Sequence, residues 1–389
     1  MKRVWLINQW LPPNVAPTGV LMAQLAQALI DRGFAVTALC RSAASPGNEA
    51  PYVEVIERVP NTPRRLLDKL SAWPRFAHAV LGHLRARVAA GDVIVVSSDP
   101  PLFFGHVIAL AQQRGAKAIH WSQDVYPEVL AAYQPWLRWP LAPLKWWRNR
   151  ALRGAAATVV ISEGMAQRLT RSRGRLVTIA NWPTHTHPDS VASIPPGSRH
   201  DDQELVIGYS GNLGRVHEFG TLVAAAARLL PEHRVRFFIT GEGPRLAELK
   251  AAVVHHGVEA RFEFAAPVPA SGLARILAAS DVHFVSLQAC FDGLVLPSKL
   301  YGIAAAKRPI LFCGAARGEV AALIAASEAG LSVAQGDSSA LLDAILRLRD
   351  PALRQRYAEG AQRMLASQGT RAEALHRWTS LIEAIARTN

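Results

Sequence analysis

The chain has 389 residues, enough for two domains with full cores, and half of its residues are apolar. Residues 1–183 hold 22 Lys/Arg against 10 Asp/Glu, a net +12, and nine of the ten tryptophans, whereas the remainder holds 21 against 20, a net +1. No apolar run reaches the roughly 18 uncharged residues of a membrane-spanning helix, and three scattered cysteines form neither a disulfide framework nor a metal-binding spacing.

Residues 1–183 alternate between strands and helices. Short apolar runs bounded by turns predict strands, and longer amphipathic stretches predict helices between them. The predicted strands are residues 4–7, 35–39, 93–97, 117–121, 158–161 and 177–180, and the predicted helices are residues 20–31, 66–90, 104–114 and 163–171. Strands and helices of these lengths favour a parallel, doubly wound sheet.

This alternation is interrupted at residues 184–203, where turn-forming residues lack hydrophobic periodicity and predict a linker. It then resumes, with strands predicted at residues 205–209, 235–240, 262–264, 282–285 and 310–312, and helices at residues 219–230 and 245–255. We therefore expect an α/β protein with two Rossmann-like doubly wound domains facing a cleft, residues 1–183 and 204–370, followed by a last helix within residues 371–389.

The segment Pro297-Ser298-Lys299-Leu300-Tyr301 lies where a loop turns into an alanine-rich helix. Unpaired N–H groups at a helix start suit phosphate, and Lys299 adds a full positive charge there. With its surroundings, residues 294–311, the segment resembles the signature of family 4 glycosyltransferases, which are retaining sugar-nucleotide enzymes of GT-B fold. The Pro-Ser-Lys-Leu-Tyr sequence within it is typical of a branch of this family that builds bacterial surface polysaccharides. Serine and lysine before a helix are also simply a good helix start.

Three strand-end turns of the second domain are similar to the family's donor-binding loops. The turn at residues 208–215 is rich in glycine, which lets the backbone approach a diphosphate. Residues 240–244 and 264–269 resemble the family segments that line the nucleotide pocket, although tight turns of this kind also occur in other doubly wound domains. The resemblance implies these donor-binding residues: Gly211, Asn212, Arg215, Gly241, Glu242, Pro267, Ser298 and Lys299, with Lys299 also catalytic.

The signature departs from the family pattern at several positions. Two glutamates that the family carries eight positions apart align with Leu294 and Gly302, so neither acid is present. Lys307 stands where glycine is usual, and Asn212 where the family has arginine. Asp292 is the acid nearest to the missing pair and could partly substitute for it.

Residues of the first domain resemble the family's acceptor side. The loop at residues 11–19 is similar to the one that closes over the donor phosphate, and its Thr18 and Gly19 would also cap the following helix. Ser98 and Asp99 follow a predicted strand and would point into the same cleft. An unremarkable turn before a helix accounts for them equally well.

Asp124 lies at the end of the predicted buried strand 117–121, in a Gln-Asp-x-Tyr-Pro-Glu stretch similar to the polysaccharide branch. Family members keep a histidine or aspartate there beside the acceptor. A carboxylate at a strand's C-terminal end could orient or deprotonate an acceptor hydroxyl, which makes Asp124 the second candidate catalytic residue. Glu128 is instead consistent with a first-turn helix acid.

Residues 133–153 form a basic, tryptophan-rich segment without an acid. Indoles beside Lys and Arg favour the lipid headgroup region and attract anionic lipid. Nucleic acid is a rival partner for such a patch, but no nucleic-acid motif accompanies it, and one of the adjacent Trp146 and Trp147 is expected in the core. The membrane-facing candidates are Trp136, Arg138, Trp139, Lys145, Arg148 and Arg150.

The resemblance implies transfer of a sugar from a nucleotide-diphosphate sugar such as a UDP-sugar to a polyprenyl-diphosphate-linked saccharide, in O-antigen, capsule or exopolysaccharide synthesis. It also implies retention of configuration and a last helix that packs back on the first domain. No Asp-x-Asp pair ends a strand, so we expect neither a metal nor another cofactor. We expect a cytoplasmic protein, peripheral on the inner membrane face, with no nucleic-acid partner. A sugar-nucleotide epimerase of the same fold and a non-catalytic sugar-nucleotide or membrane-binding module remain alternatives.

Overall fold

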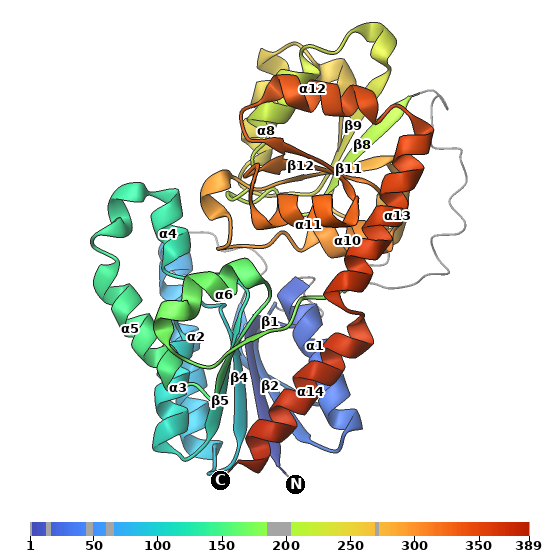
Figure 1. The fold of residues 1–389 in the computed structure, drawn as a ribbon. Helices are drawn as coiled ribbons and strands as arrows, with labels where there is room; N and C mark the ends of the chain where they lie inside the picture. Colours follow the sequence, from blue (N-terminus) through green and yellow to red (C-terminus); the bar gives the residue numbers. More distant parts are fainter. Residues whose placement is uncertain are drawn as a thin grey trace. The chain divides into compact units, whose positions relative to one another are not determined.

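The computed structural model describes residues 2–12, 17–43, 50–59, 66–184, 204–268 and 272–388 (Figure 1). The chain divides into two compact units. Unit 1 comprises residues 1–182, 293–296 and 371–389, and unit 2 comprises residues 183–292 and 297–370. Of the expected linker at 184–203, only Thr184 lies within the described residues.

Unit 1 is built on a seven-stranded parallel sheet in the order β3-β2-β1-β4-β5-β6-β7. Its strands are β1 (Arg3–Trp10), β2 (Ala35–Ala43), β3 (Val53–Val59), β4 (Val93–Ser97), β5 (Lys117–Ser122), β6 (Ala157–Val160) and β7 (Leu176–Thr178). The strand order reverses between β1 and β4, so the carboxyl ends of these two strands flank the crevice where doubly wound folds bind ligands.

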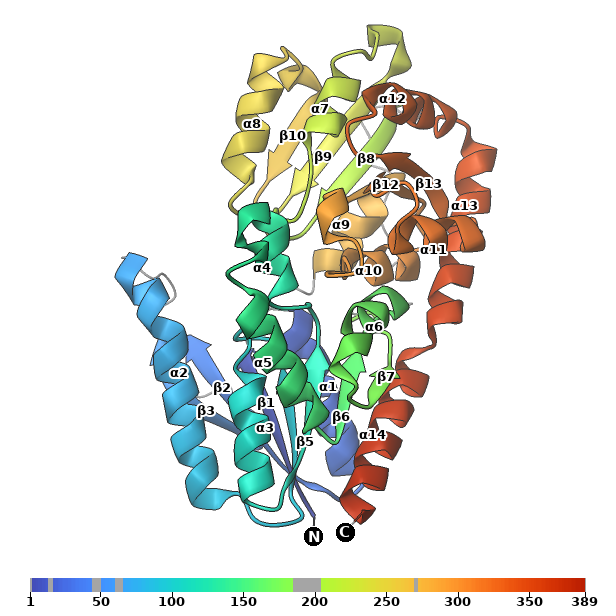
Figure 2. The ribbon, with the colours of Figure 1, turned by 60° about the vertical axis from the view of Figure 1, so that its left-hand side comes forward.

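Helices cover both faces of this sheet (Figures 1 and 2). They are α1 (Pro17–Asp31), α2 (Leu66–Arg87), α3 (Phe104–Gln113), α4 (Glu128–Tyr133), α5 (Ala142–Arg153), α6 (Glu163–Leu169) and α14 (Arg371–Arg387). Helices α1 and α14 pack together on one face, and α2 and α3 pack together on the other, with α5 against α3. The sheet is thereby buried on both sides, as the continuous apolar run of β4 requires.

The last helix belongs to unit 1 and is fixed there by a cluster of three buried indoles. Trp378 of α14 packs 4.5 Å, between ring centroids, from Trp121 of β5, which stacks in turn on Trp182 at 6.1 Å. An ion pair of 2.9 Å between Arg32 and Glu383 adds to this contact. Aromatic packing of this extent explains why the helix lies on unit 1 although its neighbours in sequence belong to unit 2.

Unit 2 carries a six-stranded parallel sheet in the order β10-β9-β8-β11-β12-β13, the arrangement of a dinucleotide-binding fold. Its strands are β8 (Leu205–Ser210), β9 (Val235–Thr240), β10 (Phe262–Ala265), β11 (Val282–Ser286), β12 (Ile310–Gly314) and β13 (Gly330–Ala334). Its helices are α7 (Gly220–Ala226), α8 (Leu246–His255), α9 (Leu273–Ala279), α10 (Lys299–Ala305), α11 (Glu319–Ser327), α12 (Ser338–Arg347) and α13 (Pro351–Gln368).

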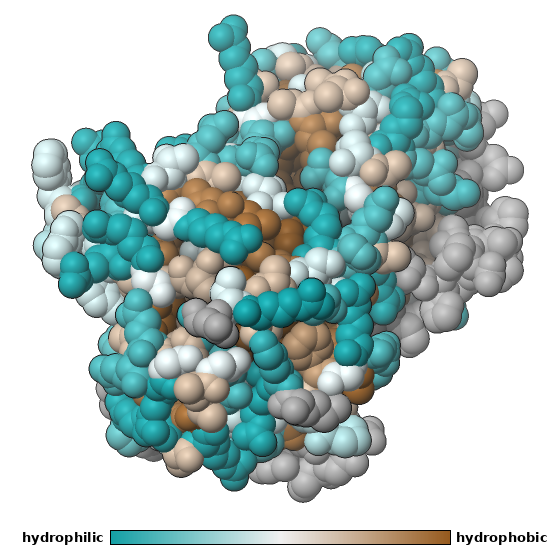
Figure 3. Space-filling view, turned by 60° about the horizontal axis from the view of Figure 1, so that its bottom comes forward, coloured by the Kyte–Doolittle hydropathy of each residue, from teal (hydrophilic) through white to brown (hydrophobic). Residues whose placement is uncertain are grey.

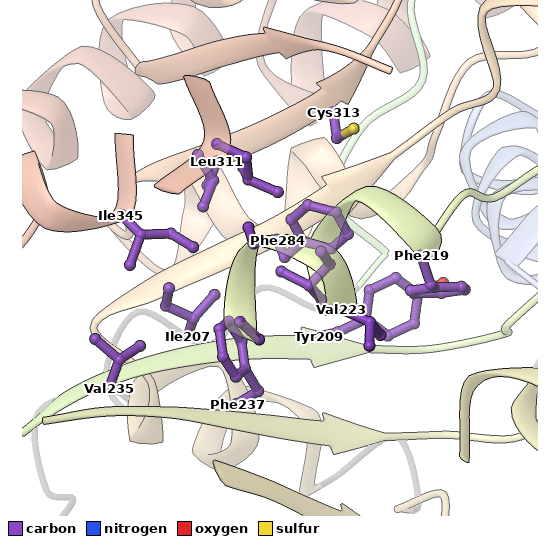
Figure 4. Packing of buried hydrophobic residues seen from close by; sticks show 14 of the residues in the cluster. Ile207, Tyr209, Phe219, Val223, Val235, Phe237, Phe284, Leu311, Cys313 and Ile345 are labelled. Carbon is purple, nitrogen blue, oxygen red and sulfur yellow. The ribbon is translucent and has the colours of Figure 1, made fainter. Parts of the chain in front are cut away.

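The core of unit 2 forms where these helices meet the sheet (Figure 4). Phe219, just before α7, packs edge-on against Tyr209 of β8 at 5.1 Å and lies 6.4 Å from Phe284 of β11, between ring centroids. Figure 4 shows Ile345 of α12 and Leu311 of β12 closing the same cluster. This aromatic packing joins β8 and β11, between which the strand order reverses.

Several predicted elements differ from those observed. The helix expected at 219–230 ends at Ala226, the helix expected at 20–31 begins at Pro17, and the strand expected at 35–39 continues to Ala43. Strands β3 and β13 were not predicted. Both lie at a sheet edge, where one side of the strand is solvated and the hydrophobic run is diluted by polar residues.

A four-residue segment, 293–296, belongs to unit 1 although unit 2 residues flank it in sequence. The backbone N–H of Val125 donates to the carbonyl of Leu294 at 2.9 Å, and Asp124 and Val295 form an antiparallel bridge. The start of the signature segment is therefore held at the carboxyl end of β5.

Within the described part of the chain, no helix combines the length and the apolarity needed to cross a membrane.

Two helical glycines of unit 2 predict opposite effects of adding a methyl group. A Cβ at Gly302 in α10 would lie 3.6 Å from Leu277 Cδ1, an ordinary contact, so Gly302→Ala should raise the free energy of unfolding by about 0.5–1 kcal/mol. A Cβ at Gly360 in α13 would lie 1.8 Å from the carbonyl oxygen of Glu328, so Gly360→Ala should lower it by about 1–3 kcal/mol. Thermal melting of the two variants and the parent measures these changes, and shifts of both variants in the same direction would contradict the contacts at Gly302 and Gly360.

Candidate functional site

The carboxyl ends of β8 and β9 carry two glycine turns that pack directly on each other. Gly211 and Gly241 have φ values of +120° and +143°, which side chains on L-residues rarely adopt. A Cβ at Gly241 would lie 2.0 Å from the carbonyl oxygen of Gly211, and one at Gly243 would lie 2.6 Å from Asn212 Oδ1. The glycines are thus required by backbone packing, which holds the peptide groups of both turns at the strand ends.

Lys299, the first residue of α10, reaches this pair of turns. Its Nζ lies 3.2 Å from the carbonyl oxygen of Asn212, 3.1 Å from Nε2 of His217 and 4.7 Å from the ring centroid of Tyr209. Desolvation lowers the pKa of the Lys299 ammonium to about 7. The positive charge at this point comes chiefly from the lysine, because α10 has only seven residues and Ser298 makes no capping bond.

His217 is buried, and its hydrogen bonds define its tautomer. Nδ1 lies 2.6 Å from the carbonyl oxygen of Ser286 at the end of β11, so it carries the proton and donates. Burial, with contributions from Lys299 and Arg245, lowers the pKa of His217 to about 3, so the ring is neutral. Nε2 is therefore left as the acceptor for the ammonium of Lys299.

The other predicted donor residues occupy exposed positions in the same strand-end region. Arg215 lies in the loop after β8, Glu242 follows β9, Pro267 follows β10, and Ser298 precedes α10. Each is exposed. Among the predicted donor residues, the structure therefore brings Lys299, Gly211, Asn212 and Gly241 together by direct packing.

The positions of the missing glutamates have other uses in this chain. Leu294 is buried in unit 1, and Gly302 lies in α10 one turn after Lys299. Asp292 Oδ1 accepts a hydrogen bond of 3.0 Å from the backbone N–H of Glu319, so it caps the start of α11. Lys307 follows α10 in the left-handed region with φ of +55°, which explains why glycine is usual there.

In unit 1, Ser98, Asp99 and Asp124 lie together at the carboxyl ends of β4 and β5. The hydroxyl of Ser98 accepts hydrogen bonds from the backbone N–H groups of Gln123 at 3.1 Å and of Asp124 at 3.3 Å. The hydroxyl of the neighbouring Ser97 instead donates a hydrogen bond of 2.7 Å to Asn8 Oδ1 at the end of β1. The Ser98 bonds join the ends of β4 and β5, and the Ser97 bond joins β4 to β1 at the crevice between these two strands.

The two carboxyl groups of this cluster have shifted proton affinities. Burial, together with the charge of Asp99, raises the pKa of Asp124 to about 7. Burial raises the pKa of Asp99 to about 6, against the opposing effect of Arg41. The Gln9 amide joins this carboxyl group to the guanidinium: its nitrogen donates to Asp99 Oδ1 at 2.9 Å and its oxygen accepts from Arg41 Nη1 at 3.0 Å. Asp124 is thus poised to exchange a proton near neutral pH.

Thr18 and Gly19 lie in the first turn of α1 rather than at its cap, because the helix begins at Pro17. A Cβ at Gly19 would lie 2.4 Å from the carbonyl oxygen of Trp10, so glycine allows α1 to approach the end of β1. Residues 13–16 of the predicted phosphate loop lie outside the described residues.

The basic, tryptophan-rich segment contains a surface of exposed aromatic side chains. Trp136, Trp139 and Trp146 are 68%, 78% and 62% exposed, and Leu130 and Tyr133 of α4 are exposed beside them in sequence. Arg138 lies over the ring of Trp139, and Arg150 is exposed on α5. On the face drawn in Figure 3, hydrophilic side chains surround smaller hydrophobic areas.

The prediction that Arg148 faces a membrane is wrong. Its side chain is buried and pairs with Glu128 Oε1 at 2.7 Å, while Nη1 donates to the carbonyl of Tyr126 at 2.9 Å. Lys145 pairs with the same carboxylate at 2.9 Å, so it is also partly neutralised. Trp147 packs against Gly105 of α3, and it is the member of the Trp146–Trp147 pair that faces inward.

Sequence reasoning missed His217, Ser286, Gln9 and Arg41. His217 follows Arg215 by two positions in a strand-end turn, and a histidine in such a turn was a signal that could have been used. Arg41 was missed because its strand was predicted to end at residue 39.

Two protein families match the two halves of the chain. Glycosyltransferase Family 4 matches residues 18–182, and Glycosyl transferases group 1 matches residues 204–350. The probable glycosyltransferase WbjE of Pseudomonas aeruginosa is 24% identical over 368 residues, which cover 88% of each protein.

Solved structures share the fold over nearly the whole chain. Sucrose-phosphate synthase of Thermosynechococcus elongatus has a TM-score of 0.77 at 19% identity, covering 99% of both chains. Anabaena HepE in complex with UDP and glucose has a TM-score of 0.70 at 16% identity, and the match covers 99% of this chain and 100% of HepE. WaaG, a glycosyltransferase involved in lipopolysaccharide biosynthesis, has a TM-score of 0.68 at 15% identity, and the match covers 98% of this chain and 99% of WaaG. The chain is a family 4 glycosyltransferase with two Rossmann-like domains of GT-B type, as its signature segment predicted.

Substitutions at Lys299 and Asp124 should separate two functions. Lys299→Ala removes the charge at the glycine turns and should weaken UDP binding and lower transfer roughly 10²-fold. Asp124→Asn should lower transfer but leave UDP binding nearly intact, because Asp124 lies in the other unit. Lys307→Ala, which removes an exposed lysine after the same helix, is the matched control and should retain both. Calorimetric UDP titration beside a transfer assay measures the effects, and loss of UDP binding in Asp124→Asn would contradict the assignment.

Proposed function

We propose that this glycosyltransferase moves a sugar from a UDP-sugar to a polyprenyl-diphosphate-linked saccharide at the inner face of the cytoplasmic membrane, during synthesis of a bacterial surface polysaccharide such as O-antigen, capsule or exopolysaccharide. Transfer proceeds with retention and without a metal. The observation that carries the proposal is the half-buried ammonium of Lys299 beside the two glycine turns of unit 2.

The donor diphosphate fits this part of unit 2. Glycine turns at the carboxyl ends of β8 and β9 leave the backbone open to close approach, and Lys299 supplies a charge that desolvation makes more effective. A fixed cation aimed at the leaving diphosphate stabilises the charge that develops as the glycosidic bond breaks. UDP is the expected nucleotide because HepE, of the same fold, was solved with UDP and glucose.

Retention and metal independence come from the family resemblance and the sequence. The chain has no Asp-x-Asp pair at a strand end that would hold a divalent ion between phosphates. Lys299 and the exposed Arg215 would provide the compensating charge from the protein itself.

Unit 1 offers the acceptor chemistry. Asp124 lies at a strand end, and its raised pKa of about 7 makes its carboxylate a stronger base than an ordinary aspartate. We assign it the orientation or deprotonation of the acceptor hydroxyl. The polysaccharide assignment is supported by the Gln-Asp-x-Tyr-Pro-Glu stretch and by the likeness of the fold to WaaG.

The aromatic surface supports a membrane-held acceptor. Exposed Trp136, Trp139 and Trp146 have the amphipathic rings that favour lipid headgroups. Arg138, Arg150 and Arg153 remain exposed in the same segment, each contributing about 1 kcal/mol near an anionic surface. Because Arg148 is buried, indole insertion carries more of the binding than the sequence alone suggested.

A transfer assay with membrane extract tests the catalytic proposal. Incubated with UDP-sugars and excess chelator, the protein should form a lipid-linked product whose new glycosidic bond keeps the donor's anomeric configuration by NMR. Complete loss of turnover with chelator, restored by magnesium or manganese, would show that a metal is needed. Interconversion of donor alone would indicate an epimerase, and no turnover with intact UDP binding would indicate a binding module.

Flotation with lipid vesicles tests the membrane proposal. The protein should float with anionic vesicles at low salt and less at high salt, because the surface potential is screened within a Debye length. Replacing Trp136, Trp139 and Trp146 by Ser should reduce flotation by at least tenfold. Trp73→Ser is the matched control, since Trp73 is 49% exposed on α2, outside the segment. Equal flotation of the triple variant and the parent would mean that these indoles do not contact lipid, and a soluble acceptor would then be favoured.

A further inference from the structure

We propose that His217 is the positioning residue for Lys299: as a neutral imidazole fixed by Ser286, it presents Nε2 to the ammonium and holds that charge at the glycine turns where the donor diphosphate binds. This inference rests on the proposed function for the role of the diphosphate. The placement of Lys299 by His217 rests on the geometry of unit 2 alone.

The first step is the fixed orientation of the imidazole. The carbonyl of Ser286 can only accept, so the 2.6 Å contact requires a proton on Nδ1. A neutral ring then has its lone pair on Nε2, and this atom lies 3.1 Å from Lys299 Nζ. The ring is buried among aromatic neighbours, with Tyr209 edge-on at 5.9 Å between centroids, which restricts its rotation.

The second step is the rigidity of the loop that carries His217. Its carbonyl accepts hydrogen bonds from the Arg245 guanidinium and, at 3.2 Å, from Gln288 Nε2. The backbone N–H of the next residue, Glu218, donates to Ser286 Oγ at 3.1 Å. Ser286 therefore anchors both residues at the end of β11, which restrains the imidazole that accepts the hydrogen bond from Lys299.

The third step is the electrostatic balance around the ammonium. Tyr209 on β8 and His217 in the following loop contact the ammonium, and Arg245 before α8 donates to the backbone carbonyl of His217. Glu218 is the next residue in the same loop. The Glu218 carboxylate is occupied, because Oε1 accepts from the Thr221 N–H at 2.9 Å and Oε2 from Cys313 Sγ at 3.5 Å. Among these named groups, the neutral His217 is thus the side chain that accepts a hydrogen bond from Lys299.

Removing this acceptor should make the ammonium less stable. Desolvation already lowers the pKa of Lys299 to about 7, and a hydrogen bond to the charged form opposes that effect. In His217→Phe, which keeps an aromatic ring, we expect the Lys299 titration to move down by about one pH unit. His217→Gln, whose side-chain oxygen can accept, should recover most of the shift. Exposed His256, just after α8, provides the control variant His256→Gln.

Competitive acetylation across pH 5–9, followed by mass spectrometry of the Lys299 peptide, reads the titration without any substrate. At pH 6 the Lys299 of His217→Phe should react about fivefold faster than that of the parent, the ratio of free amine that a one-unit shift from pH 7 produces. His217→Gln should lie close to the parent, and His256→Gln should be unchanged. Unchanged reactivity in a folded His217→Phe would overturn the proposal.

Two further measurements keep the positioning and the donor function distinguishable. Nitrogen NMR of the histidine rings in the parent should show His217 neutral with its proton on Nδ1, and an Nε2-protonated ring would overturn the proposal even if His217→Phe does not fold. In UDP titrations, the pH above which affinity falls should move down in His217→Phe by the same unit, because the diphosphate binds the charged lysine. If the acetylation shift occurs but the parent does not bind UDP, the positioning stands and the proposed donor function fails.

Discussion

The arrangement of unit 2 depends on keeping one ammonium group out of bulk water at the carboxyl ends of β8 and β9. A desolvated lysine is costly, and the chain reduces that cost with a carbonyl, a neutral imidazole and the face of Tyr209 around Nζ. The glycines at 211 and 241 let the two turns pack against each other and against this lysine, since a Cβ at Gly241 would lie 2.0 Å from the carbonyl oxygen of Gly211 and one at Gly211 would lie 3.1 Å from Lys299 Cε. A charge held in this way needs little reorganisation when an anion arrives, which is the property that electrostatic catalysis requires.

Much of the fold was predictable because short apolar strands and amphipathic helices alternate along the chain, and parallel doubly wound sheets follow from that alternation. The edge strands β3 and β13 were not, since a half-solvated strand lacks a continuous apolar run. Helix limits were also displaced, as at Ala226, because packing rather than local propensity determines where a helix stops.

The site was predictable only where one segment carried its own signal. Lys299 and the glycine turns could be read from local sequence, but His217 lies 82 positions from Lys299 and gains its role only when β8, β11 and α10 come together. Arg148 shows the reverse error. Its partner Glu128 lies 20 positions upstream, before the acid-free segment, so a cation that looked available to lipid is neutralised by the fold. Charge counted along a sequence therefore overstates charge available at a surface.

The two units place complementary titrations in one chain. Burial lowers the pKa of Lys299 and raises that of Asp124, and both reach about 7. The charge states that the proposed reaction uses, an ammonium in unit 2 and a carboxylate in unit 1, consequently coexist in a pH range around neutrality. A bound diphosphate would favour the ammonium and extend that range upward, so donor binding itself would bring Lys299 into its charged state while Asp124 is free to accept a proton.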